Sequence, residues 1–160
     1  MPDRRTTLQR TPLPFGKLSP NFNLESVGDG LHYTREGFRG KAGLLIIFFS
    51  DPAAVYDLLS AVGRDSAEYA ELNARVFALS PADRESLLSL AADLPFPILR
   101  DAEGKAWTAF TGAGEYAYAV FSLDTYGGVE GQRVVATAAE LPNAKELLYW
   151  VQGAQFKCSI

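Results

Sequence analysis

The chain has 160 residues, of which 48% are hydrophobic and 21% are charged, and its formal net charge at pH 7 is −4. This length and apolar fraction are typical of one compact domain, which excludes a disordered or low-complexity protein. The negative charge argues against non-specific attraction to nucleic acid, so we expect no nucleic-acid partner.

The first 16 residues are expected to form a loosely ordered arm ahead of one domain, which we predict over residues 17–160. Residues 1–14 hold three prolines and three arginines but no apolar run, which is not the pattern of a secretory signal. The longest apolar run, Ala42–Phe49, is far shorter than the roughly 20 residues that a membrane-spanning helix needs. We therefore expect no membrane partner, and a cytoplasmic location is the simplest interpretation.

The first half of the domain predicts a short extended segment, a buried strand and a helix. Phe22–Leu24 alternates in hydropathy and leads to a turn at Gly28–Gly30. Leu44–Phe49 is continuously apolar and rich in β-forming residues, which is typical of a central strand covered on both faces. Ser50–Pro52 combines a capping side chain with a proline at the first helical position, so we expect a helix to begin there. The apolar stripe of this helix recurs at helical spacing, at Val55, Leu58, Leu59 and Val62.

After this helix we expect a break near Gly63, a further short helical stretch, and a strand at Val76–Leu79. Ser80–Asp83 is a variant of the capping box, with proline inside the first turn of the next helix. That helix is expected to end before Pro95, because proline disfavours the helical conformation of the residue before it. Its apolar positions are Leu87, Leu88, Ala91 and Leu94.

The last third of the chain predicts an antiparallel pair of strands followed by a final helix. The elements before this helix are an extended segment at Phe96–Leu99, a helix at Ala106–Phe110, a strand at Tyr118–Leu123 and its partner at Arg133–Ala136. Asn143, with Glu146 three residues further on, caps the final helix. The alternation of strands and helices predicts an α/β fold with a mixed sheet and helices on both faces.

Five segments of the chain, in order, form a recognisable set. They are Ser19–Leu24, Gly37–Phe49, Phe77–Ser80, Phe96–Lys105 and Val120–Gly128. Over roughly residues 18 to 130 these segments resemble five motifs of the peroxiredoxins, the AhpC/TSA group. In order, the family motifs are the A-P-x-F-x-L opening, the R-G-K loop with the first central strand, the second central strand, the F-P-L-L-x-D-x-x-G-K segment and the F-V-I-D-x-x-G hairpin. This resemblance implies a thioredoxin-like fold of the peroxiredoxin type, with a central mixed sheet and helices on both faces.

The catalytic positions of that family do not match. Peroxiredoxins carry a P-x-x-x-T/S-x-x-C motif after the first central strand, and its thiolate attacks the peroxide while a distant arginine lowers the pKa of the thiol. Setting the motif on Pro52 places Tyr56 at the threonine and Leu59 at the cysteine. The position of the arginine, six residues before Asp124, is Tyr118. The resemblance thus implies a degenerate member with vestigial active-site positions at Pro52, Tyr56, Leu59 and Tyr118, and no residue is assigned a catalytic role.

The sequence contains one cysteine, Cys158, and one histidine, His32. These counts exclude an intrachain disulfide, a CxxC motif and zinc sites built from several imidazoles, and we expect no metal ion and no cofactor. Cys158 is the only candidate for redox chemistry or a disulfide. If the last helix continues, it shares a stripe with Leu147 and Val151 and packs as a small hydrophobic residue. If the end of the chain frays, it is accessible and can form an intermolecular disulfide or a sulfenic acid.

Three other polar residues have simpler interpretations. Ser50 and Asp51 stand where the active-site loop of the family would be, and we interpret them as helix caps. The alternative is a small anion pocket at the helix N-terminus, which the carboxylate of Asp51 would disfavour. His32 follows a Gly-Asp-Gly turn and is expected in a surface loop.

Two functions remain as hypotheses. The first is a peroxiredoxin-like pseudoenzyme, not an active peroxidase, that acts by self-association as a homodimer or by binding a protein partner. The alternative is a residual thiol-dependent oxidoreductase or antioxidant protein that works through Cys158, including as a disulfide-linked homodimer. A pseudoenzyme that partners an active relative is a third, narrower version of the first.

Overall fold

A five-stranded mixed sheet forms the centre of the computed structural model, which describes residues 11–159 of the chain and the side chains of residues 11–154. The strand order is β5-β4-β3-β6-β7. The strands are β3 (Gly43–Phe49), β4 (Ala74–Ser80), β5 (Ile98–Arg100), β6 (Tyr118–Leu123) and β7 (Val129–Val135). The pairs β3–β4 and β4–β5 are parallel, whereas β3–β6 and β6–β7 are antiparallel. A separate hairpin joins β1 (Asn23–Glu25) to β2 (His32–Thr34).

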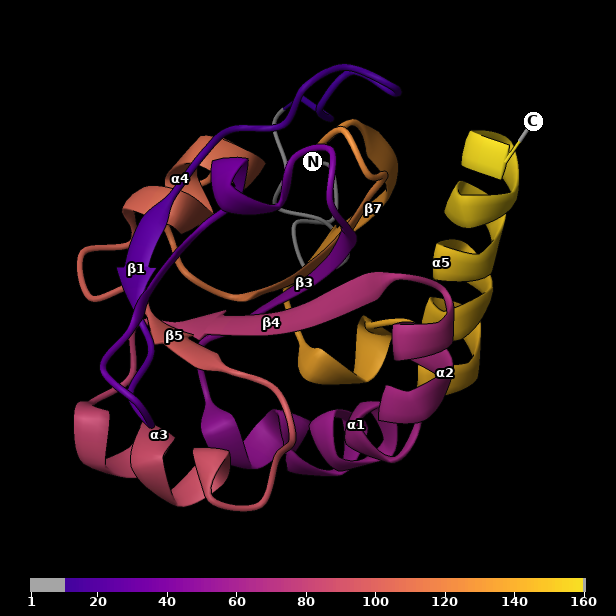
Figure 1. Ribbon diagram of the computed structural model, residues 1–160. Helices are drawn as coiled ribbons and strands as arrows, with labels where there is room; N and C mark the ends of the chain where they lie inside the picture. The colour runs from indigo at the N-terminus through magenta and orange to yellow at the C-terminus, as the bar shows by residue number, and fades with distance from the viewer. Residues whose placement is uncertain (1–10, 160) are drawn as a thin grey trace.

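Helices cover both faces of this sheet, as the sequence predicts. Figure 1 shows α4 on one side of the strands and α1 and α3 on the other. The helix α5 contacts β3, β6, β7 and α1. The helices are α1 (Pro52–Arg64), α2 (Ser66–Glu71), α3 (Arg84–Ala91), α4 (Lys105–Thr111) and α5 (Ala144–Ser159), with short 3-10 helices at Glu36–Phe38 and Ala138–Glu140.

The central strand β3 explains why its sequence is apolar without interruption. All seven of its residues are buried, because helices pack on both of its faces. The ring of Phe48 lies within 6 Å of the ring centroids of Trp107, Phe110 and Phe121, which join α4 and β6 to this strand. This aromatic cluster forms the core on the α4 side of the sheet.

The first and last long helices begin where their capping residues predict. The Asp51 carboxylate accepts a hydrogen bond from the Ala53 N–H at 3.1 Å. At α5 the Asn143 side chain accepts from the Glu146 N–H at 2.9 Å, and the Glu146 carboxylate accepts from the Asn143 N–H at 3.5 Å. These contacts confirm the two predicted starts.

The expected break near Gly63 and the short helix after it are confirmed, but the break falls at Asp65, between the end of α1 at Arg64 and the start of α2 at Ser66. A Cβ atom at Gly63 would lie 2.9 Å from the Cδ atom of Pro95. The glycine therefore allows the helix to pack closely against the loop before β5, and it does not end the helix.

The predicted start of α3 is wrong, whereas the helix does end before Pro95, as predicted. The N-cap is Asp83, whose carboxylate accepts from the Ser86 N–H at 3.0 Å and from the Ser86 hydroxyl at 2.8 Å, so Pro81 precedes the helix. Hydrogen bonds to the Asp83 carboxylate hold its pKa below the usual range. The helix ends at Ala91, so Leu94 of the predicted stripe lies beyond it. Its buried residues are Leu87, as predicted, and Leu90, whereas Leu88 is exposed.

The edge strand β7 is lined by the first described residues of the chain. The Gly16 N–H donates to the Val129 carbonyl at 2.8 Å, and the Val129 N–H donates to the Lys17 carbonyl at 3.1 Å. The main chain of Leu13 exchanges two hydrogen bonds with the Gln132 side chain, at 3.0 and 2.8 Å. Most of the predicted N-terminal arm, residues 1–10, lies outside the described residues.

Two further findings concern His32 and the membrane. His32 is exposed but lies on β2 rather than in a loop, and its Nδ1 atom is 2.9 Å from Asn23 Oδ1 on β1. Among the described residues, no helix has both the length and the apolar character to cross a membrane.

Candidate functional site

Two of the positions singled out by the family resemblance lie at one end of the sheet. The strand β3 ends at Phe49, and α1 begins three residues later at Pro52. Tyr118 begins β6 directly opposite Phe49 and is only 8% exposed. Pro52 and Tyr118 thus flank the carboxyl end of β3, and neither carries a thiol.

The other two positions have different surroundings. Leu59 is completely buried on the stripe that α1 turns to the core, together with Val55 and Val62. Tyr56 is 43% exposed, and its hydroxyl donates to the Asp93 carboxylate at 3.4 Å. Leu59, which the resemblance matches to the family's thiol, is therefore part of the hydrophobic core, about two turns inside the helix.

The N-terminus of α1 carries its own carboxylate. Asp51 caps the helix, and the first turn exposes the methyl groups of Ala53 and Ala54. The backbone N–H groups of a helix N-terminus attract anions, but a carboxylate already placed there repels a second one. The capping interpretation of Asp51 is confirmed, and this end of the helix lacks the setting that activates a thiolate.

A buried carboxylate organises the segment that resembles F-P-L-L-x-D-x-x-G-K. Asp101 accepts hydrogen bonds from the Ala106 N–H at 3.2 Å, the Trp107 N–H at 3.0 Å and the Tyr116 hydroxyl at 3.1 Å. Burial raises the pKa of Tyr116, and the charge and hydrogen bond of Asp101 raise it further, so the phenol keeps its proton. The Tyr116 ring stacks on Trp107 with centroids 4.7 Å apart. This cluster fastens α4 to the loop before β6.

Cys158 falls on α5, which extends to Ser159. Its side chain lies outside the side chains that the structure describes.

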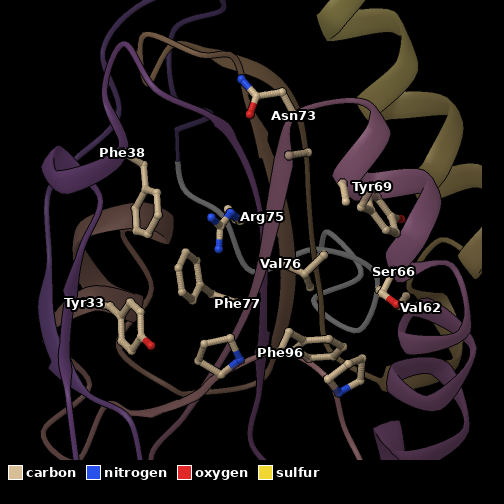
Figure 2. A pocket seen from close by; sticks show the side chains of 14 residues that line it. Tyr33, Phe38, Val62, Ser66, Tyr69, Asn73, Arg75, Val76, Phe77 and Phe96 are labelled. Atoms are coloured by element: carbon tan, nitrogen blue, oxygen red, sulfur yellow. The ribbon is translucent and has the colours of Figure 1, made fainter.

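A groove that the sequence did not predict lies along the outer edge of β4. The short strand β5 pairs only with the last three residues of β4, Ala78–Ser80. Residues 74–77 of β4 pair with β3 on one side only, and a groove of about 390 Å³ lies along their other side. Figure 2 shows this groove between the aromatic side chains of the two faces of the sheet.

Aromatic side chains wall the groove on one face of β4. The rings of Tyr33 and Phe38 each lie 5.3 Å from the ring of Phe77, measured between centroids. The guanidinium of Arg75 lies over the Phe38 ring, 6.0 Å from its centroid. Burial raises the pKa of Tyr33, and its hydrogen bond to Asp29 adds to the effect.

The other wall is formed by α1, α2 and the loop before β5. Val62 and Tyr69 lie on this side with Val76, and Phe96 closes one end (Figure 2). Burial raises the pKa of Tyr69, and its hydroxyl has no hydrogen-bond partner within the described part of the chain. The sequence signal for this groove is the pair Pro95 and Pro97. Because proline has no N–H to donate, these residues cannot extend β5 toward its N-terminal side along β4.

Solved structures share the fold of this chain. The reduced 2-Cys peroxiredoxin of Plasmodium vivax matches with a TM-score of 0.79 and 18% identity, covering 91% of this chain and 99% of that one. AhpC of Mycobacterium tuberculosis gives 0.76 and 16%, covering 92% and 96%. The peroxidoxin BcpB of the same organism gives 0.73 and 16%, covering 87% and 96%. Neither a protein-family model nor a curated protein matches the sequence. The likeness establishes the predicted thioredoxin-like fold of the peroxiredoxin type.

Proposed function

We propose that this chain is a binding protein built on the peroxiredoxin fold, and that its binding surface is the groove beside β4. The observation that carries the proposal is the half-paired strand: residues 74–77 of β4 offer one main-chain edge inside a groove with apolar walls. Such an edge suits the binding of another polypeptide, because main-chain hydrogen bonds supply affinity and the walls supply selectivity. In this proposal the chain is a pseudoenzyme.

Three observations support the pseudoenzyme part of the proposal. Leu59 stands in the core, the first turn of α1 exposes alanines, and Asp51 places a negative charge at the helix end. The groove lies beside the amino-terminal half of β4, whereas Pro52 and Tyr118 lie at the carboxyl end of the neighbouring strand β3. We accordingly interpret Pro52, Tyr56, Leu59 and Tyr118 as vestigial positions with structural roles.

The purified chain is expected to consume hydrogen peroxide no faster than dithiothreitol alone. The reason is that its single thiol, Cys158, is remote in sequence from the α1 positions and has no resolving cysteine. Peroxide loss is measured for the wild type and for Cys158→Ser, and the two rates should coincide. Turnover that Cys158→Ser abolishes, or a disulfide-linked dimer on a non-reducing gel, would instead establish the thiol-dependent alternative.

Peptides selected from a displayed random library are expected to need the groove. Ala70 lines the groove from α2 and is exposed, so Ala70→Trp fills the groove without entering the core. Ala67 is exposed on the same helix but does not line the groove, which makes Ala67→Trp the matched control. Selected peptides should lose binding to Ala70→Trp and keep it to Ala67→Trp. Peptides that bind all three proteins equally, or a selection without binders, would contradict the proposal.

Self-association as a homodimer is the second part of the proposal. Leu18 and Tyr126 are 52% and 65% exposed. They lie together at the turn between β6 and β7, because Leu18 bridges Gly128. Clustered exposed apolar side chains are typical of interfaces. Sedimentation velocity distinguishes the dimer from a monomer, and a monomer at all concentrations would exclude self-association.

A further inference from the structure

We infer that the groove takes an extended segment of a partner protein, which adds to the sheet as a strand beside β4 and turns an acidic side chain toward Arg75. The inference rests on the proposed function and names the occupant of the same groove. It is argued from the main chain of β4, from the alternation of its side chains and from the charge of the groove.

The main chain of β4 alternates between its two neighbours. The Asn73 carbonyl accepts from the Gly43 N–H at 3.0 Å, so this residue faces β3. The Ala78 N–H donates to the Pro97 carbonyl at 3.3 Å, so Ala78 faces the opposite side. Because a strand has a period of two, the N–H and C=O groups of Ala74 and Val76 also face that side.

These outward groups form a ready edge for pairing. The structure gives the outward main-chain groups of Ala74 and Val76 no hydrogen-bond partner within the described residues. Two such residues, spaced two apart, repeat the pattern of donors and acceptors that a neighbouring strand requires. The first requirement on the occupant is therefore an extended main chain.

The side chains of β4 set the sequence pattern of the occupant. Figure 2 shows Arg75 and Phe77 on one face of the strand and Val76 on the other, toward Tyr69. Cross-strand neighbours on one face come within about 5 Å between their Cβ atoms. A segment paired with β4 therefore presents one side chain beside Arg75, and its next side chain meets the apolar wall of Val62 and Tyr69.

Among the described residues that line the groove, Arg75 is the only charged one. It is exposed, and among the described residues it makes no ion pair; its contact is with the ring of Phe38. A guanidinium held in this way offers a planar fork that matches a carboxylate. Charge complementarity thus selects aspartate or glutamate at the position that faces Arg75, with apolar residues on either side.

A second copy of the chain does not fit the groove as well as a single strand does. Val76 is 7% exposed and Ala74 is 4% exposed, so this edge lies below both walls. The same edge of a second copy lies equally deep, and two recessed edges cannot approach within the 4.8 Å or so that separates paired strands. A segment that is free of its own sheet can enter.

The experiment uses the folded full-length chain and a synthetic peptide with the core Val-Glu-Val-Glu-Val between glycine-serine ends. Binding is followed by NMR, through the amide resonances of Ala74 and Val76, and by fluorescence anisotropy. We expect Arg75→Glu to weaken binding at least about tenfold and to improve binding of the peptide with lysine in place of glutamate. Arg133→Glu is the matched control, because Arg133 is exposed on the opposite edge strand and also lies over an aromatic ring, that of Trp150.

N-methylated peptides test the strand pairing itself. Methylating the main-chain nitrogen of a peptide residue whose N–H faces β4 should abolish binding. Methylating the nitrogen of the residues between them should leave binding unchanged. A peptide that fails to bind the wild type, a charge swap without effect, or methylation effects without alternation would overturn the inference. If one of these results is obtained but library peptides still lose binding to Ala70→Trp and not to Ala67→Trp, the proposed function stands without the inference. If library peptides also bind Ala70→Trp and Ala67→Trp equally, both the inference and the proposed function fail.

Discussion

Replacing Asp101 with alanine is expected to lower the free energy of unfolding by about 3–5 kcal/mol, as measured by urea denaturation. The carboxylate is 1% exposed and accepts hydrogen bonds from two backbone N–H groups at the start of α4 and from the Tyr116 hydroxyl. Alanine would leave these three donors buried without an acceptor. The loss should therefore exceed the worth of any one of the three bonds.

Two variants separate this network from an ordinary loss of hydrogen bonds. Tyr116→Phe removes one donor and should cost about 1 kcal/mol. Asp124 accepts from the N–H groups of Tyr126 and Gly128 at 2.8 and 2.9 Å, but it is half-buried in a turn. Asp124→Ala should therefore cost less than Asp101→Ala. Equal losses in the two alanine variants would show that burial of Asp101 adds nothing.

Leu59→Ala is expected to lower the free energy of unfolding by about 3 kcal/mol, because a fully buried leucine leaves a cavity when it is shortened. Leu58, its neighbour on α1, is half-buried, so Leu58→Ala should cost about 1 kcal/mol. The same denaturation experiment compares the two. If Leu58→Ala were the more damaging, the placement of the α1 stripe would be wrong.

A thiol at this position tests the chemistry as well as the packing. In a Cys158→Ser background, the thiol of Leu59→Cys should react with a disulfide reagent only after unfolding, since the site is closed to solvent. The thiol of Ala54→Cys, on the exposed first turn of the same helix, should react at once. Rapid reaction of Leu59→Cys, or peroxide turnover by it, would contradict the assignment of this position to the core.

The parts of the fold that the sequence predicts well have local causes. The run Leu44–Phe49 is apolar throughout because both of its faces are covered, and a period of two or of 3.6 is visible in one chain segment. The caps Asp51 and Asn143 bond to residues two or three positions away. In contrast, the capping-box pattern predicts a start of α3 at Ser80, and the structure shows that the helix begins three residues later, with Asp83 as its N-cap.

The groove could not be predicted from any local pattern in the sequence. It exists because β4 has seven residues while β5 has three, and because their pairing starts at Ala78. Which residues of β4 find a partner on this side depends on the length and place of β5, a segment about 20 residues further along the chain. The prolines at 95 and 97 were present in the sequence, but their meaning depends on which strand lies beside them.

The positions that the resemblance matches to the family motif show a related limit of the spacing. The cysteine of that motif stands seven positions after the proline. Here α1 begins at Pro52 itself, so the seventh residue is already inside the helix, on its buried stripe. The spacing predicts which residue stands at the cysteine position, but the burial of Leu59 follows from where the helix begins.

The hydrogen bonds between Leu13 and Gln132 tie together residues 119 positions apart. Contacts of such high sequence separation carry a large loop-closure entropy, and they raise the contact order that slows folding. During synthesis, residues 13–17 must wait until β7 has left the ribosome before their partners exist. The strands β3 and β4, joined through α1 and α2, can form earlier. We therefore expect the two edges of the sheet to fold at different times, and the β7 edge to fold last.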